Sequence, residues 1–454
     1  MARPLRVAVV GSGPSGMYAA DALISQQDLP VTVDVIDKLP VPFGLVRYGV
    51  APDHVSIRSV RDTLDKVFEK PGVRFIGGLE VGVDISVQTL HEFFDAIMFT
   101  YGASRDRRLG VPGEDLDGSV AATDFVAWYC GHPDADRATF ERLIPTATSA
   151  VVVGVGNVAV DVTRVLAKTV DELTHTDMPE YVLDTLRKSL LTDIHVLGRR
   201  GPAQATYTTK ELRELGELLD ADIVVERADL VFDAGSEQAI ANDKSIARNV
   251  EVVKEWATRR TTGKSRRIHL HFMSRPVELR GDDRVREVVV ERTELDGAGG
   301  AKGTGETFVI KADLVVRSVG YRGMALPGVP FDEGQSVIPH LDGRVQLGGA
   351  PVSGQYVAGW IKRGPTGIIG TNKKDATATV AALLADANNL PAAPLPSPAD
   401  FDTWLLQSGI TVVDSAGWQL IDAAERALGE SKGRERTTIQ TTEDLLNAAN
   451  AIVS

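Results

Sequence analysis

Two glycine-rich segments contain the residue types and spacing that could do chemistry. Residues 7–16 read VAVVGSGPSG and place Gly11, Gly13 and Gly16 in the pattern G-x-G-x-x-G. Between an apolar strand and a helix, this pattern binds the pyrophosphate of a dinucleotide, because the glycines permit a tight turn, close ligand approach and close helix packing. The helix N-terminus adds a partial positive charge. The alternative is a purely structural glycine turn.

The strand after this first loop ends in Asp37, about 20 residues downstream, where dinucleotide-binding folds place a carboxylate on the ribose. A second loop at 151–159 reads VVVGVGNVA and places Gly154, Gly156 and Ala159 in the variant G-x-G-x-x-A. Its following strand ends in Arg199 and Arg200.

The two strand endings predict different ligands. A carboxylate binds free ribose hydroxyls and repels a 2′-phosphate, whereas paired guanidinium groups bind that phosphate through charge-assisted hydrogen bonds. The second loop should therefore prefer NADP(H), with a surface arginine pair as the alternative. Two loops in one chain suggest one resident flavin nucleotide and one diffusing nicotinamide nucleotide.

Repeated strand–turn–helix units must position these loops. Short apolar runs are predicted as buried parallel strands, and the segments after each glycine loop have helical spacing. This alternation predicts an α/β protein with parallel sheets. The expected strands are 7–10, 31–36, 150–153 and 194–197, and the expected helices include 17–25, 57–69, 158–168 and 209–219. Residues 223–300 read as charged segments with short strands, ending in ELDGAGGAKGTG, which is either a hairpin tip or a flexible loop.

Composition limits the function classes. A chain of 454 residues, 43% hydrophobic and 24% charged, is typical of a soluble protein with two domains. No apolar stretch reaches the roughly 20 residues that span a bilayer, and the first strand begins too early for a secretory signal, so we expect a cytoplasmic protein. Cys130 is the single cysteine, which excludes a disulfide framework and an internal cysteine-ligated iron–sulfur cluster. The net charge of −13 argues against general nucleic-acid binding.

With these segments together, the chain resembles the adrenodoxin-reductase-type ferredoxin–NADP reductases, above all the actinobacterial FAD-containing NADPH–ferredoxin reductases. The matching segments include VAVVGSGPSG, LPVPFGLVRYGVAPDH, YGASRDRRLGVPGEDLDG, GVGNVAVDVTRVL, LGRRGPAQATYTTKELREL, RSVGYRG and GWIKRGPTGIIGTNKKDA. The resemblance implies two Rossmann-like domains. An FAD domain formed by 1–105 and 320–454 would hold an inserted NADP domain, 106–319.

The resemblance also implies site residues. The FAD contacts of the family fall on Ser15, Asp37, Leu45, Val81, Trp360, Gly367, Ile368 and Ile369. Its NADP contacts fall on Arg107, Asn157, Val158, Ala159, Val160, Arg199, Arg200, Glu211 and Gly367. This sequence has Asp37 where the family commonly has Glu. The turn GPTGIIG opens a helix whose N-terminus can stabilise negative charge on a reduced flavin, although a well-capped surface helix is the alternative.

Two further residues are candidates for the catalytic centre. His54 lies in the family-like segment VAPDH and could hydrogen-bond near the flavin or orient Trp360, with a structural hydrogen bond as the alternative. Glu214 shares a helix face with Glu211 and is a candidate neighbour of the nicotinamide, unless both lie on a solvated face. His269 and His271 alternate on a probable strand, and without a third ligand nearby we expect no metal site.

The resemblance implies hydride transfer from NADPH to FAD and then single-electron transfer to a ferredoxin, so we expect no covalent nucleophile. An acidic ferredoxin needs a local basic patch on this acidic chain. The candidate charges, each of which could instead be an ordinary solvated residue, are Lys362, Arg363, Lys373, Lys374, Arg105, Arg107, Arg108, Lys210 and Arg213.

Three rival functions are open to the sequence. One is an NADPH diaphorase or quinone-type reductase without a protein partner. Another is the nucleotide-binding subunit of a larger complex such as glutamate synthase, but such subunits normally carry cysteine-ligated clusters, which one cysteine excludes. A third is a nucleotide-sensing module without catalysis, which would bind NADPH without reducing a flavin.

Overall fold

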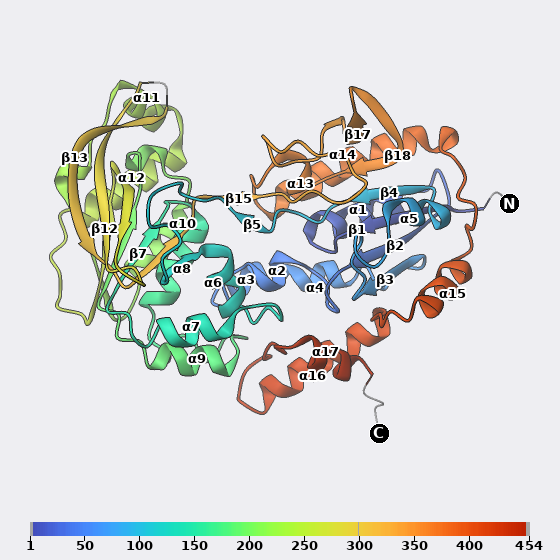
Figure 1. Ribbon diagram of the computed structural model, residues 1–454, viewed down its shortest axis with the longest axis horizontal. Coiled ribbons are helices and arrows are strands. Elements are labelled where there is room, and N and C mark those ends of the chain that lie inside the picture. Colours follow the sequence, from blue (N-terminus) through green and yellow to red (C-terminus); the bar gives the residue numbers. More distant parts are fainter. Residues whose placement is uncertain (1–2, 298, 451–454) are drawn as a thin grey trace. The chain divides into compact units, whose positions relative to one another are not determined.

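The computed structural model describes residues 3–297 and 299–450, and these divide into two compact units (Figure 1). The first unit comprises Met1–Arg105 and Tyr321–Ser454, so that the blue and the orange-red parts of the ribbon belong together. The second unit comprises Asp106–Gly320. The domain limits expected from the sequence differ from this division by one residue, at the second crossing.

A seven-stranded sheet in the order β16-β17-β18-β4-β1-β2-β3 forms the centre of the first unit. Strands β1, β2, β3, β4 and the end of β18 run parallel, and the β16–β17–β18 edge is antiparallel. All six residues of β1 are buried, as expected for a central parallel strand. The strands are β1 (Leu5–Val10), β2 (Val31–Asp37), β3 (Val73–Gly77), β4 (Ala96–Phe99), β16 (His340–Leu341), β17 (Arg344–Leu347) and β18 (Ala350–Val357).

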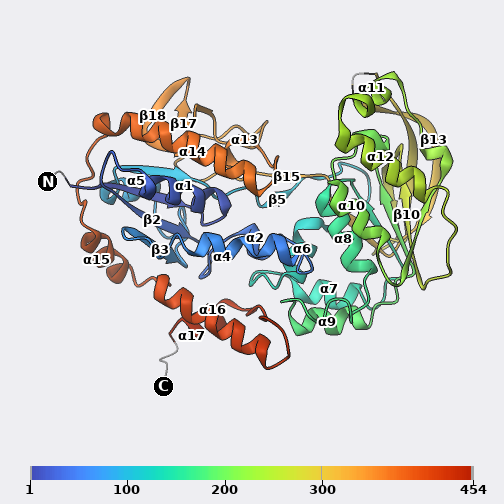
Figure 2. The same ribbon diagram turned by 180° about the vertical axis from the view of Figure 1, so that it is seen from behind.

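The helices of the first unit come from both ends of the chain. Helices α1 and α14 lie side by side, as both views show (Figure 2). Pro14 opens α1 at a position where its missing N–H costs no hydrogen bond. The helices are α1 (Pro14–Ser25), α2 (Leu45–Tyr48), α3 (Val55–Arg58), α4 (Val60–Asp65), α5 (Val87–Phe93), α13 (Trp360–Arg363), α14 (Ile369–Asp386), α15 (Pro398–Ser408), α16 (Ser415–Glu430) and α17 (Thr442–Ala449).

A buried ion-pair network joins the C-terminal helices to the N-terminal part of the first unit. The Arg47 guanidinium on α2 donates two hydrogen bonds to the Glu425 carboxylate on α16, and Arg436 donates a third at 3.2 Å. All three side chains are buried, so the charges must be paired to be tolerated. This network therefore fastens α2 to α16 and joins the two chain segments of the first unit.

The second unit contains a parallel six-stranded sheet in the order β6-β14-β7-β8-β10-β9, and an antiparallel sheet, β11-β12-β13. The parallel strands are β6 (Ser119–Ala121), β7 (Ser149–Val153), β8 (Asp193–Leu197), β9 (Ala221–Val225), β10 (Arg266–His271) and β14 (Leu314–Arg317). The antiparallel strands are β11 (Ser274–Arg280), β12 (Glu287–Leu295) and β13 (Ala301–Lys311). The predicted hairpin tip is confirmed, because Leu295 of β12 pairs with Ala301 of β13.

The helices of the second unit are α6 (Ala122–Tyr129), α7 (Arg137–Leu143), α8 (Asn157–Ala167), α9 (Glu180–Arg187), α10 (Thr209–Gly216), α11 (Ala234–Asn242) and α12 (Lys244–Trp256). Short 3-10 turns occupy Pro202–Gln204, Arg227–Asp229 and, in the first unit, Ala387–Asn389. Two-residue strands, β5 (Arg105–Asp106) and β15 (Tyr321–Arg322), lie where the chain passes between the units.

The α/β fold class with two Rossmann-like units is confirmed, and two local predictions are wrong. The expected helix 57–69 is two short helices, α3 and α4, which meet at Ser59. The region 223–300 contains α11 and α12, which were not expected: α11 has a weak helical period, whereas α12 carries apolar residues at helical spacing, Ile246, Val250, Val253 and Trp256. In the part of the chain that the structure describes, no helix combines the length and the apolar character needed to cross a bilayer.

Candidate functional site

The first glycine loop has the geometry that its pattern predicts. Gly11 has φ of +105°, and a Cβ there would lie 2.7 Å from the Cα of Tyr101. A Cβ on Gly16 would lie 1.9 Å from the carbonyl oxygen of Gly11. A Cβ on Gly13, the N-cap of α1, would meet no atom within 4 Å. Gly11 and Gly16 therefore let the strand and the helix pack closely, whereas Gly13 borders open space that a ligand can occupy.

Asp37 lies at the end of β2 and is bonded to the same loop. Its Oδ2 accepts hydrogen bonds from the Ser12 N–H at 2.8 Å and from the Ser12 hydroxyl at 2.5 Å. Its Oδ1 accepts the Leu39 N–H at 3.0 Å. Burial raises the pKa of Asp37, and the Ser12 hydrogen bonds act in the opposite direction. The carboxylate thus shapes the loop as well as standing at the ribose position, a link to Ser12 that sequence reasoning missed.

The other residues expected around FAD lie on α1, α2 and α13, in the turn that leads into α14, and, for Val81, in the segment between β3 and α5. Ser15 donates a hydrogen bond to the Asn372 Oδ1 at 3.0 Å. Leu45, the first residue of α2, is 38% exposed although apolar, and Val81 is buried. The indole N–H of Trp360 is buried, and among the described residues it has no hydrogen-bond acceptor.

The turn before α14 is open on its outer side. Gly367 has φ of +84°, and the side chain of Ile368 at the helix N-cap is 66% exposed. Ile369 begins the helix. Exposed Leu45 and Ile368, an unpaired indole N–H and the space above Gly13 together fit a large, flat, partly apolar dinucleotide, so the residues present are compatible with FAD.

The second glycine loop repeats this geometry in the other unit. Gly154 has φ of +133°, and a Cβ there would lie 2.1 Å from the carbonyl oxygen of Ser318. Gly156 is the N-cap of α8. Ala159 and Val160 are buried, with 0% and 4% of their surface exposed. The remaining two predicted contact residues open α8, where the Asn157 side chain accepts the Thr208 N–H at 2.8 Å and Val158 is half-buried.

Arg199 and Arg200 follow β8 and leave positive charge without a carboxylate. Arg199 is exposed and has no acidic partner in the part of the chain that the structure describes. Arg200 donates hydrogen bonds to the carbonyl oxygens of Gly299 at 3.0 Å and Gln204 at 3.4 Å. Burial and the neighbouring Arg199 lower the pKa of Arg200. Two adjacent cations held only by neutral groups suit a phosphate dianion.

One buried arginine gathers the acidic candidates of the second unit. Arg164 on α8 is 1% exposed and lies 2.9 Å from Asp161, 3.5 Å from Glu211 and 3.6 Å from Glu214. Glu211 is itself buried, which rules out the solvated-face interpretation for that residue. Sequence reasoning missed Arg164; its signal was an arginine in an otherwise apolar stretch of α8, three residues after Asp161.

The structure shows where His54 and Arg107 lie but does not test the roles predicted for them. His54 is buried in the first unit, at the N-cap of α3, and its carbonyl oxygen accepts the N–H groups of Ile57 and Arg58. Arg107 is exposed in the second unit, and its N–H donates to the Gly320 carbonyl. The catalytic assignment of His54 and Glu214 stays a prediction.

The expectation that no third histidine lies near His269 and His271 is wrong. The parallel register of β8 and β10 places His195 opposite His269, with the two rings stacked at 4.5 Å. His195 Nδ1 lies 3.0 Å from His271 Nε2. Burial lowers the pKa of His195 to about 4 and that of His271 to about 3. Because the rings stack face to face, their nitrogen lone pairs do not converge on one point as metal ligands do.

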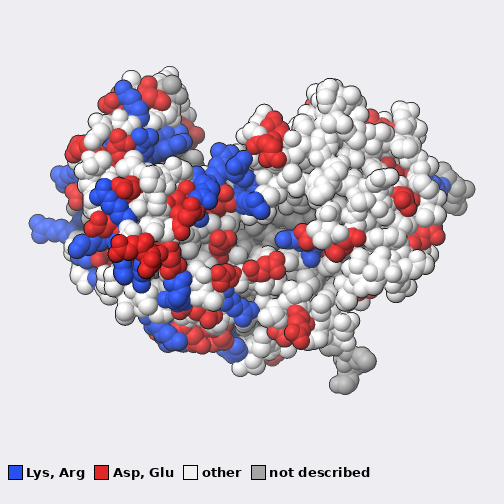
Figure 3. All heavy atoms as spheres, viewed as in Figure 1, with Lys and Arg blue, Asp and Glu red and all other residues white. Residues whose placement is uncertain are grey.

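Lys362 and Arg363 are not free docking charges, contrary to expectation. Lys362 Nζ bonds Asp375 at 2.7 Å, and Arg363 bonds the Asn372 side chain at 2.5 Å. Lys373 and Lys374 are exposed. On the face in Figure 3, the first unit shows few charged side chains, whereas both signs are interspersed over the second unit. That face therefore carries no large field of one sign.

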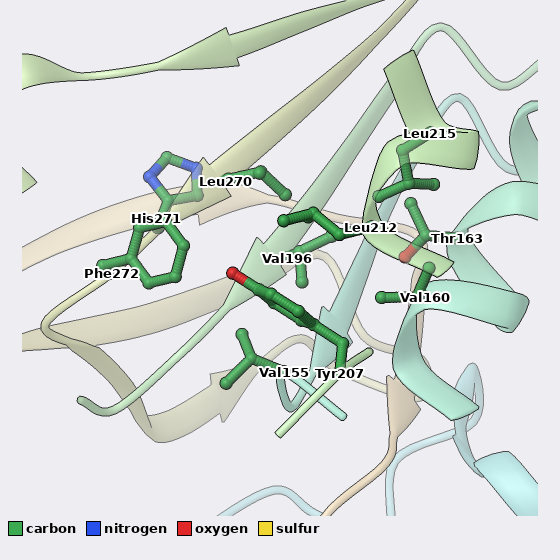
Figure 4. A pocket seen from close by; sticks show the side chains of 10 residues that line it. All are labelled: Val155, Val160, Thr163, Val196, Tyr207, Leu212, Leu215, Leu270, His271 and Phe272. Atoms are coloured by element: carbon green, nitrogen blue, oxygen red, sulfur yellow. The ribbon is translucent and has the colours of Figure 1, made fainter. Parts of the chain in front are cut away.

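A small apolar cavity lies beneath the second loop (Figure 4). The buried Tyr207 side chain crosses it, with its hydroxyl directed toward the side lined by His271 and Phe272. That hydroxyl has no hydrogen-bond partner among the described residues, and burial raises its pKa. The remaining lining residues are Val155, Val160, Thr163, Val196, Leu212, Leu215 and Leu270.

Comparison with known proteins places this geometry among characterised reductases. Residues 9–61 match the NAD(P)-binding Rossmann-like domain. The chain is 43% identical to NADPH-ferredoxin reductase FprA of Mycobacterium tuberculosis, an alignment covering 98% of this chain and 99% of that protein. It is 36% identical to the mitochondrial NADPH:adrenodoxin oxidoreductase of Arabidopsis thaliana, covering 98% and 96% of the two chains.

A solved structure agrees over the whole length. Mycobacterium tuberculosis FprA in complex with NADPH superimposes with a TM-score of 0.91 at 42% identity, covering 99% of this chain and 100% of that one. The similarity therefore extends through both units and their connections.

Proposed function

The chain belongs to the adrenodoxin-reductase-type NADPH–ferredoxin reductase family, and from that premise we propose that it is an FAD-dependent oxidoreductase that passes electrons from NADPH to a ferredoxin. When bound, FAD accepts a hydride from NADPH and releases its electrons one at a time. The protein supplies binding, orientation and electrostatics for the two nucleotides.

The first unit holds the FAD. The α1 N-terminus and the open Gly13 receive the pyrophosphate, and Asp37 stands at the ribose. Trp360 offers its unpaired indole N–H, and Leu45 and Ile368 offer apolar surface to the ring system. Gly367 and Ile369, at the start of α14, place main-chain N–H groups and the helix dipole where negative charge develops.

The second unit binds NADPH. Main-chain groups of the loop from Gly154 to Val160 receive the pyrophosphate, and Arg199 with Arg200 binds the 2′-phosphate. The observation that carries the proposal is this cation pair, which has no carboxylate partner among the described residues and stands where the first unit has Asp37. Arg164 holds Glu211 and Glu214 in place for the nicotinamide end.

The electron acceptor is a ferredoxin, a small iron–sulfur protein. Because this chain carries a net charge of −13, an acidic partner must approach a locally basic surface. The exposed candidates are Arg105, Lys373 and Lys374 in the first unit, and Arg107, Arg108, Lys210 and Arg213 in the second, of which Arg108 is paired with Asp115. Association through such charges weakens as salt screens them.

A cytochrome c reduction assay with and without ferredoxin tests this function. We expect NADPH-dependent reduction of cytochrome c to rise at least about tenfold when ferredoxin is added, and to fall as ionic strength increases. A rate that ferredoxin does not change would instead support a diaphorase, and a rate that salt does not change would refute the basic docking surface.

We further propose a cytoplasmic location. It is supported by Cys130, a buried residue and the single cysteine of the sequence, since one cysteine cannot form a disulfide within the chain and proteins of oxidising compartments commonly carry disulfides. Fractionation of the source cells with antibodies to the chain tests it, and recovery outside the cytoplasmic fraction would refute it.

A further inference from the structure

Two residues on one face of α14 connect separate segments around the proposed FAD site. Asn372 and Asp375 lie three residues apart on this helix, so their side chains leave it on the same side. Asn372 is 8% exposed, and the Asp375 side chain is 12% exposed. Both use their acceptor atoms on segments outside α14.

Asn372 joins the first glycine loop to the turn after Trp360. Its Oδ1 accepts the Ser15 hydroxyl at 3.0 Å and the Arg363 guanidinium at 2.5 Å. Ser15 lies in the first turn of α1, and Arg363 is the last residue of α13. One buried oxygen therefore fixes the distance between two segments that are far apart in the sequence.

Asp375 binds a main-chain group before Trp360 and a side chain after it. Its Oδ2 accepts the N–H of Gly359 at 2.6 Å, and its Oδ1 accepts the ammonium of Lys362 at 2.7 Å. Gly359 has φ of +80°, and a Cβ there would lie 2.2 Å from the Ser15 hydroxyl oxygen. Trp360 thus stands in a turn that is bound at each end to one carboxylate and pressed against Ser15.

We propose that Asn372 and Asp375 are positioning residues that set Ser15 and the Trp360 indole at the spacing FAD requires. The proposal rests on the function proposed above. Asp375 neutralises the cations of Lys362 and Arg363, and the turn at Gly359 has an unusual backbone geometry. These features surround Trp360, whose indole N–H has no hydrogen-bond partner among the described residues. Holding contact groups in place before the ligand arrives lowers the entropy cost of binding.

The test compares substitutions that remove an acceptor with ones that keep it. Asn372→Leu and Asp375→Leu remove the acceptors, whereas Asn372→Asp and Asp375→Asn retain an acceptor oxygen. Thr377→Leu, on the exposed side of the same helix, is the matched control. The measurements are the rate of FAD release after dilution, followed by flavin fluorescence, and the fine structure of the visible flavin spectrum.

We expect the two leucine variants to release FAD about tenfold faster or more, the change produced by losing about 1.4 kcal/mol. Their flavin spectra should lose fine structure, because Trp360 is no longer fixed beside the ring. Asn372→Asp should stay within about threefold of the wild-type rate, and Thr377→Leu should be unchanged. Rescue by the conservative variant separates positioning from general stability.

Wild-type release rates and spectra in the leucine variants would overturn the proposal, as would an equal effect of Thr377→Leu. If a leucine variant does not fold, Asp375→Asn decides the matter: its amide keeps one acceptor oxygen and loses the other, so we expect FAD release faster than wild type, and unchanged release and spectrum would overturn the role of Asp375. Wild-type protein that retains no FAD would overturn the proposed function together with this inference.

Discussion

The two glycine loops of this chain share one geometry and differ in what surrounds it. In both, the first glycine has a positive φ and approaches backbone so closely that a side chain would clash, at Tyr101 for Gly11 and at Ser318 for Gly154. In both, the second glycine is the N-cap of the following helix. The common part is therefore a pyrophosphate cradle that does not specify which dinucleotide is bound.

The differences lie at the third position and at the end of the next strand. Gly16 has no room for a Cβ, whereas Ala159 has its methyl group fully buried without strain. The Asp37 carboxylate accepts hydrogen bonds from Ser12 of the first glycine loop. Arg199 and Arg200, by contrast, have no carboxylate partner among the described residues. Ligand choice thus resides in charge placed one strand away from a shared turn.

The largest expected effect comes from exchanging the third loop residues. Gly16→Ala should force α1 away from β1, because its Cβ would lie 1.9 Å from the Gly11 carbonyl oxygen. We expect a loss of about 3 kcal/mol in the free energy of unfolding and protein that purifies without flavin. Urea unfolding and the ratio of flavin to protein absorbance measure both.

The converse change, Ala159→Gly, is the control. It should cost only about 1 kcal/mol, the difference in helix propensity between the two residues, and should leave FAD bound. Equal losses in the two variants would contradict the difference between the loops.

Removing both guanidinium groups should change coenzyme preference next most strongly. Arg199→Ala combined with Arg200→Ala removes two charge-assisted hydrogen bonds, so kcat/KM for NADPH should fall about 100-fold or more. Activity with NADH should change less than about threefold, since NADH lacks the 2′-phosphate. Arg260→Ala, an exposed arginine of the same unit, is the control. Equal losses with the two coenzymes would refute the phosphate role.

Lowering the pH should destabilise the second unit more than the first. Burial lowers the pKa of His195 to about 4 and of His271 to about 3, whereas unfolded histidine titrates near 6.5. The unfolded chain therefore binds more protons as the pH falls from about 6.5 to about 4, and the second unit loses stability across that range. Asp37, whose pKa is raised by burial, has the opposite sign in the first unit.

We expect the first melting transition of the flavin-loaded protein to fall by about 5 °C between pH 7 and pH 4.5, a loss of about 2 kcal/mol. Replacing both His195 and His271 with Gln should reduce this slope. Scanning calorimetry with flavin fluorescence identifies which unit melts, and melting of the flavin-bearing unit first would contradict the prediction.

The smallest effect concerns the cavity beneath the second loop. Tyr207→Phe removes a buried hydroxyl that has no partner among the described residues, so unfolding free energy should stay equal or rise by about 0.5–1 kcal/mol. NADPH binding should not change. A loss of more than about 1 kcal/mol in urea unfolding would show that the hydroxyl is hydrogen-bonded to water in the cavity.

Much of the fold was predictable because its signal is local. The apolar runs that became β1, β2, β7 and β8, and the glycine turns after β1 and β7, need only short stretches of sequence to be recognised. Helix α11 was missed because its sequence has a weak apolar period, whereas α12 was missed although Ile246, Val250, Val253 and Trp256 recur at helical spacing among charged residues. The break between α3 and α4 was missed because no Gly or Pro marks it.

The site was predictable to the level of loops and strand endings, and less so for individual side chains. Ser12 binding to Asp37, and Arg164 gathering two glutamates, depend on which residues the fold brings together over long sequence separations. Lys362 and Arg363 looked like surface charges in the sequence, yet a carboxylate twelve or more residues later turns them inward. Such pairings follow from packing, which residue types alone do not specify.

An anaerobic titration of the FAD-loaded protein tests the central claim most directly. The visible flavin absorbance is followed as NADPH or NADH is added in the absence of oxygen. We expect near-stoichiometric NADPH to bleach the flavin band, whereas far more NADH should be needed. The Arg199→Ala, Arg200→Ala variant should lose this preference for NADPH over NADH. An absent band, no bleaching by NADPH, or equal bleaching by both coenzymes would contradict it.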